Sequence, residues 1–117
     1  MTMEHRWSER KPIELDVALF YAPVGMITGK TRDVSLEGMY VQTEGVQLPL
    51  HAELEISFVT ETSNGARREH HLPACVVHGD GVGVGLMLRH MSYGDFYALR
   101  HMLTATPASL QHAVTTQ

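Results

Sequence analysis

Two arginines near the start of the chain are the residues best suited to hold an anionic ligand. Arg6 and Arg10 are four residues apart in an otherwise polar arm. Each guanidinium is planar and permanently charged, so it can form two parallel hydrogen bonds with a phosphate or with the O6/N7 edge of guanine. It can also lie flat on a purine ring. The same spacing is typical of a solvated charged arm, in which Glu4 and Glu9 neutralise the arginines.

A second polar group follows in the segment RDVSLEGMY, at residues 32–40. Asp33 and Ser35 are two positions apart, so in an extended segment they face the same side. A carboxylate accepts hydrogen bonds from guanine N1–H and N2–H, and a hydroxyl donates or accepts. Gly38 allows a positive φ and a close approach of the backbone to a ligand. These are ordinary turn residues, but combined with the two arginines they fit a guanine nucleotide better than a sugar or an apolar ligand.

Other kinds of site match the sequence poorly. The glycines of residues 79–85 do not follow G-x-G-x-x-G and lead into an expected strand, so no helix N-terminus is available for a phosphate. The eight histidines show no fixed ligand spacing, and we expect them to be exposed or at a rim, with no metal bound. No recognised nucleophile–base motif is present, so we expect neither an enzyme nor a cofactor. The formal net charge of −4 argues against DNA or RNA binding through a broad basic surface.

Alternation of apolar and polar residues predicts a mainly β chain. The expected strands cover residues 13–21, 26–33, 38–43, 53–58, 72–78 and 82–88. In the last of them, the residues expected on the inner face are Val82, Val84, Leu86 and Leu88. Asn64-Gly65 is a strong hairpin signal between the fourth and fifth strands. Six short strands with turn signals between them indicate a small antiparallel barrel or sandwich.

One helix is expected after the strands. Ser92 followed by Asp95 is a capping-box-like start, and Phe96, Leu99 and Leu103 then share one helical face. Three parts of the chain follow from these elements. They are a flexible N-terminal arm at residues 1–12, a barrel with its helix at 13–104, and a mobile tail at 105–117.

The expected compartment is the cytoplasm. The chain has a single cysteine, Cys75, so it cannot form an internal disulfide, and a reducing compartment fits best. The first residues are polar and show no apolar segment of a secretory signal. No apolar run approaches the roughly 18 residues that a membrane span requires, so we expect none.

The two motifs, in this order, resemble those of the PilZ domain, a bacterial receptor domain for cyclic di-GMP. That family has R-x-x-x-R before the first strand and D-x-S-x-x-G about one hairpin later. The matching residues are Arg6, Arg10, Asp33, Ser35 and Gly38. The segment GVGVGLMLRHMS, at residues 81–92, is similar to the last barrel strand of the family, with Leu88 where an aromatic residue is usual. The resemblance extends over roughly residues 5–104.

The resemblance implies a six-stranded antiparallel β-barrel with a C-terminal helix and a ligand site on its outer surface. The two arginines would clasp phosphates and guanines, Asp33 and Ser35 would contact a guanine or phosphate, and Gly38 would admit the ligand.

Four further positions are implied as candidates for the site. His5 precedes the first arginine, where the family tunes whether one ligand or a stacked pair binds. Trp7, inside the arm, either stacks on the ligand or anchors the arm to the barrel. Gly85 and Met87 lie on the expected last strand.

The expected function is therefore a cyclic di-GMP receptor in second-messenger signalling, of the kind that controls motility or biofilm formation. Its arm would close on the ligand and change the surface offered to an unidentified effector protein. The alternative is a PilZ-like protein–protein adaptor in pilus or motility machinery, which binds no nucleotide because its motif residues are satisfied internally.

Overall fold

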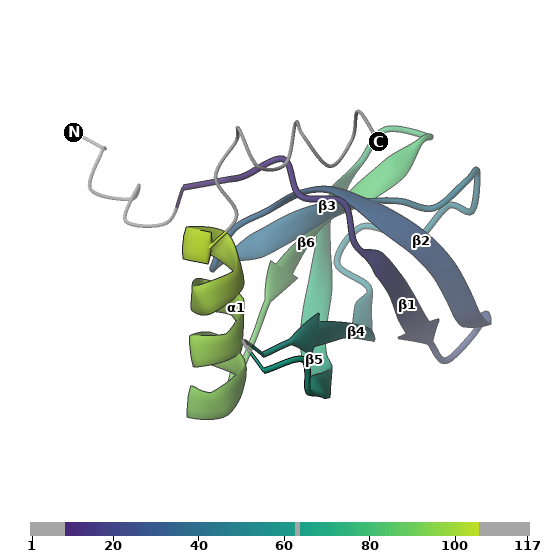
Figure 1. Ribbon diagram of the computed structural model, residues 1–117. Helices are drawn as coiled ribbons and strands as arrows, with labels where there is room; N and C mark the ends of the chain where they lie inside the picture. Colours follow the sequence, from purple (N-terminus) through teal and green to yellow (C-terminus); the bar gives the residue numbers. More distant parts are fainter. Residues whose placement is uncertain (1–8, 63, 106–117) are drawn as a thin grey trace.

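A computed structural model of the protein describes residues 9–62 and 64–105, and it contains six strands and one helix (Figure 1). The strands are β1 (Asp16–Tyr21), β2 (Gly25–Val34), β3 (Gly38–Gln42), β4 (Glu53–Glu61), β5 (Arg67–Gly79) and β6 (Gly83–Leu88). The helix α1 (Tyr93–Ala105) stands at one side of the strands. Over the described ranges, no helix combines the length and the hydropathy needed to cross a membrane.

The strands form a closed antiparallel barrel in the order β1-β2-β3-β6-β5-β4. The ring closes because β1 pairs with β2 on one side and with β4 on the other. Closure gives each of the six described strands two neighbours, which limits the free edges that a small all-β domain would otherwise expose to other chains. The predicted six-stranded antiparallel barrel with a C-terminal helix is confirmed.

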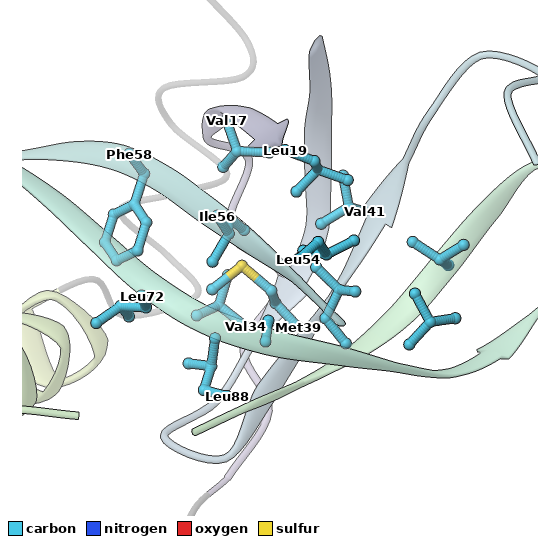
Figure 2. Packing of buried hydrophobic residues seen from close by; sticks show 14 of the residues in the cluster. Val17, Leu19, Val34, Met39, Val41, Leu54, Ile56, Phe58, Leu72 and Leu88 are labelled. Atoms are coloured by element: carbon cyan, nitrogen blue, oxygen red, sulfur yellow. The ribbon is translucent and has the colours of Figure 1, made fainter. Parts of the chain in front are cut away.

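The barrel interior is filled by the apolar residues of the alternating strands. Leu19 on β1 and Ile56 on β4 are fully buried and lie opposite each other in the strand pairing. Figure 2 shows these side chains packed with their neighbours Val41, Leu54 and Phe58. The expected alternation therefore placed the core correctly on these strands.

At the start of the last strand the expected pattern is wrong. The alternation predicts Val82 on the inner face, but Val82 is 54% exposed. It lies in the turn before β6, where Asp80 Oδ1 accepts a hydrogen bond from its backbone N–H at 3.0 Å. The turn geometry breaks the two-residue alternation, so the regular inner face begins only at Val84.

The start of α1 follows the predicted capping pattern. The Ser92 hydroxyl accepts a hydrogen bond from the Asp95 backbone N–H at 3.1 Å and donates one to Asp95 Oδ2 at 2.9 Å. Of the predicted apolar face, Leu99 and Leu103 are buried in the core cluster, whereas Phe96 is only half-buried and does not join that cluster. This packing supplies most of the stability of a helix of this length.

His70 differs from the expectation that the histidines are exposed or at a rim. Its side chain is 2% exposed and stacks on Phe58, with ring centroids 5.2 Å apart. Its Nδ1 donates to Asp95 Oδ1 at 2.8 Å, and its Nε2 lies 2.8 Å from the Thr60 hydroxyl. The imidazole therefore links β4, β5 and α1. Within the described part of the chain, no group of three or more His, Cys, Asp or Glu residues is arranged to hold a metal ion.

The Asp95 carboxylate makes this link sensitive to acid. Burial alone would raise the pKa of Asp95, but hydrogen bonds from His70 and Ser92 outweigh burial and hold it below its ordinary value of 3.8. The stabilisation of the fold by the Asp95 carboxylate is therefore complete at pH values above its ordinary pKa of 3.8. It is lost as the pH falls through the lowered pKa of the folded protein.

We expect the D95N variant to lose about 1 kcal/mol of unfolding free energy near neutral pH and much less at about pH 3. Urea unfolding at a series of pH values measures this difference. The control D16N removes an exposed carboxylate whose ion pair with Lys30 spans 3.6 Å, and it should change stability by less than about 0.5 kcal/mol. A D95N effect that stays constant down to about pH 3 would show that the carboxylate charge is not responsible.

Candidate functional site

The segment before β1 is held against the end of β2. The backbone groups of Lys11 and Val34 exchange two hydrogen bonds, of 2.8 and 2.9 Å. The buried Thr31 hydroxyl accepts from Leu15 N–H at 2.8 Å and donates to the Ile13 carbonyl at 2.6 Å. Lys11 of the predicted arm therefore pairs with the end of β2, and Figure 1 shows this segment in purple.

This course brings the second motif arginine to the motif aspartate. Arg10 Nε donates to Asp33 Oδ1 at 2.8 Å, and Arg10 Nη2 donates to the same oxygen. The pair stays accessible, with the Arg10 side chain 51% and the Asp33 side chain 25% exposed. Two predicted site residues that are 23 positions apart are thus in direct contact. The predicted site residues His5, Arg6 and Trp7 lie outside the described residues.

Ser35 lies at the same end of β2 but is oriented differently from the prediction. Its hydroxyl accepts from the Glu37 and Gly38 N–H groups at 3.1 and 3.2 Å and lies 3.2 Å from the Gly38 carbonyl. The residue is 1% exposed. The expected common face with Asp33 is therefore wrong, because β2 ends at Val34 and Ser35 already belongs to the turn. The observed contacts of Ser35 close this turn, and its contact with a ligand stays a prediction.

Gly38 is required for a reason other than the expected one. It is not among the described glycines with positive φ, so the conformational freedom that a glycine allows here is not used. It is the first residue of β3 and pairs with Met87 of β6. A methyl group in place of its α-hydrogen would lie 2.1 Å from the Leu86 carbonyl oxygen. Gly38 therefore permits close contact between two strands, and its contact with a ligand stays a prediction.

The two candidates on β6 lie in the same region. Met87 pairs with Gly38, and its side chain is exposed on the outer surface. Gly85 pairs with Tyr40 and with His78. A methyl group on Gly85 would lie 2.3 Å from His78 Nε2, so the glycine provides the space that the imidazole occupies.

A second arginine, absent from the predicted site residues, borders the aspartate. Arg32 Nε lies 3.8 Å from Asp33 Oδ2, the carboxylate oxygen that Arg10 does not contact. Asp33 is therefore flanked by two guanidinium groups. The position of Arg32 directly before the D-x-S-x-x-G motif is the sequence signal that could have identified it as a site residue.

Beside this cluster, Tyr40 is locked in place by Asp80. The Tyr40 hydroxyl lies 2.7 and 2.8 Å from the two carboxylate oxygens of Asp80. This hydrogen bond, with those from the Gly83 and Val82 backbone N–H groups, lowers the pKa of Asp80 to about 2. Burial and the hydrogen bond to Asp80 raise the pKa of Tyr40. At ordinary pH the phenol is therefore neutral and its carboxylate anchor is charged.

A separate hollow of about 1000 Å³ lies on another part of the barrel surface. Its lining includes the carboxylates of Asp16, Glu44 and Glu69 and the ammonium group of Lys30. This excess of negative charge disfavours a ligand with phosphates. The two guanidinium groups beside Asp33 therefore favour that cluster over the hollow as the anion site.

Comparison with known proteins identifies one family. A family model described as the PilZ domain matches residues 4–105. The PilZ domain of CeSA from a cellulose-synthesizing bacterium has a similar structure, with a TM-score of 0.65 and 18% identity over 83% of this chain and 96% of that one. The Bacillus subtilis inhibitor of motility (MotI/DgrA) gives a TM-score of 0.71 and 17% identity over 86% of this chain and 51% of that one. At these identities the two structures show a shared fold. No curated protein sequence matches the chain.

Proposed function

This chain belongs to the PilZ domain family, generally receptors or adaptors for cyclic di-GMP, and we propose that it binds cyclic di-GMP on the barrel surface around Asp33. The contact between Arg10 and Asp33 carries this proposal. It places the cation of the first motif beside the acceptor of the second. Internal pairing of this kind is also what the adaptor alternative expects, so the exposure of both side chains is what favours a ligand site. Because both side chains remain accessible, a ligand can reach them without unfolding the barrel.

Each group then has a role that its chemistry favours. The Arg10 guanidinium, together with Arg6 from the arm, binds phosphate oxygens or the O6/N7 edge of a guanine. The Asp33 carboxylate accepts from the N1–H and N2–H groups of a guanine. Ser35 fixes the turn that follows β2 and so holds Asp33 in position.

The proposed output is a change in the surface that the protein offers to an effector protein. Binding through Arg6 draws the arm onto the barrel, and the closed arm forms a new contact surface. The protein acts by binding, without catalysis, and works in the cytoplasm.

Calorimetric titration with cyclic di-GMP tests the proposal directly. We expect heat of binding, with an affinity that falls as salt concentration rises, because phosphate contacts release counterions. Cyclic di-AMP should bind far more weakly, because adenine lacks the N1–H and N2–H donors that Asp33 accepts. Fluorescence of Trp7, the only tryptophan, should change in the same titration. Absence of both heat and fluorescence change would overturn the proposal and favour the nucleotide-independent adaptor.

A further inference from the structure

A bulge in β2 places an additional arginine on the ligand-binding surface. The strand pairing runs from Thr31 opposite Val41 directly to Asp33 opposite Tyr40, so Arg32 is an extra residue without its own partner. A bulge breaks the alternation of faces and re-aims neighbouring side chains. As a result Arg32 and Asp33, which are consecutive, are both accessible, with side chains 57% and 25% exposed.

A second bulge, in β5, brings a histidine to the same aromatic ring. Here the pairing runs from Val76 opposite Leu86 directly to His78 opposite Gly85. The His78 imidazole stacks on Tyr40, with centroids 6.0 Å apart and planes 22° apart. Two independent irregularities therefore direct side chains toward Tyr40, one from each side of the β3–β6 pair.

Arg32 lies directly over the Tyr40 ring. Its guanidinium carbon is 3.9 Å from the ring centroid, which is close contact for a cation–π pair. The ring is itself fixed by Asp80 and is 2% exposed, so it forms a rigid base. An exposed arginine on a flexible stem is thereby held in one orientation before any ligand arrives, which lowers the entropic cost of binding.

We propose that Arg32 is a third arginine of the ligand site and stacks on a guanine base of the bound nucleotide. This inference rests on the proposed cyclic di-GMP function. A guanidinium that lies on one aromatic ring can present its other face to a second ring. The neighbouring Asp33 accepts from the edge of a guanine and repels phosphate, so a base fits beside Arg32 better than a phosphate does.

The test compares R32A and R32K with the wild type by calorimetric titration with cyclic di-GMP. R32A removes both the positive charge and the planar guanidinium group, whereas R32K keeps the charge but replaces the planar group with an ammonium. We expect R32A to weaken binding roughly 10-fold to 100-fold and R32K to weaken it nearly as much. The matched control is R67A, which removes an exposed arginine at the opposite end of β5 from His78 and should bind like the wild type.

The outcomes separate this inference from the proposed function. If the wild type binds and R32A binds equally well, Arg32 is not part of the site. If R32A is weakened but R32K matches the wild type, Arg32 contributes charge alone and the stacking assignment is overturned. If the wild type shows no binding, the proposed function itself fails and this inference fails with it. Thermal unfolding of each variant verifies that the exposed substitution leaves the barrel folded.

Discussion

Replacing Arg10 with alanine is expected to weaken cyclic di-GMP binding about 100-fold, or roughly 3 kcal/mol. The side chain is already oriented by two hydrogen bonds to Asp33, so the wild type does not have to order it on binding. Its removal takes away a forked cation from the ligand and leaves the Asp33 carboxylate less compensated beside the incoming phosphates. Calorimetric titration of R10A against the wild type measures the loss.

The K11A variant provides a matched control for this experiment. Lys11 is the next residue and also carries a positive charge, but its observed role is the backbone bridge to Val34, which alanine preserves. We expect K11A to lower the affinity less than about threefold, as a change in long-range attraction. R10A itself should change the free energy of unfolding by less than about 1 kcal/mol, because the Arg10–Asp33 pair is solvent-accessible. Unchanged affinity in R10A would remove Arg10 from the site.

The G38A variant should lower the free energy of unfolding by about 3 kcal/mol. The new methyl group would lie 2.1 Å from the Leu86 carbonyl oxygen and 3.2 Å from the Leu86 carbonyl carbon. Both atoms belong to the backbone of β6, so no side-chain rotation relieves the overlap. The two strands must separate where Gly38 pairs with Met87, at the turn that Ser35 closes. Urea unfolding followed by circular dichroism measures the loss.

Gly79 offers the matched control, because it is a strand glycine with room for a methyl group. An added methyl group there would lie 3.7 Å from its nearest neighbours, the Gly83 carbonyl oxygen and a Val84 methyl carbon. We expect G79A to change stability by less than about 1 kcal/mol. If G38A were equally mild, the close approach of β3 and β6 would not be the reason for a glycine at position 38.

The local elements of this protein could be predicted from its sequence. Alternation around Leu54 and Ile56 marked a strand with one buried face, because side chains on a regular strand alternate strictly between its faces. The helix start at Ser92 was equally readable, because a cap is formed by residues within one turn. The motif residues Arg10 and Asp33 were selected by their chemistry, which does not depend on distant strands.

Tertiary structure alone decided how the site is assembled. Sequence periodicity assigns faces only while the strand is regular, and the bulges at Arg32 and before His78 arise from pairing with other strands. For the same reason the close contact of Gly38 with β6 and the burial of His70 beneath α1 could not be read locally. Local patterns in the sequence specify which elements form and which chemistry they carry. The closure of the barrel determined which side chains meet, because those contacts join residues that only strand pairing brings together.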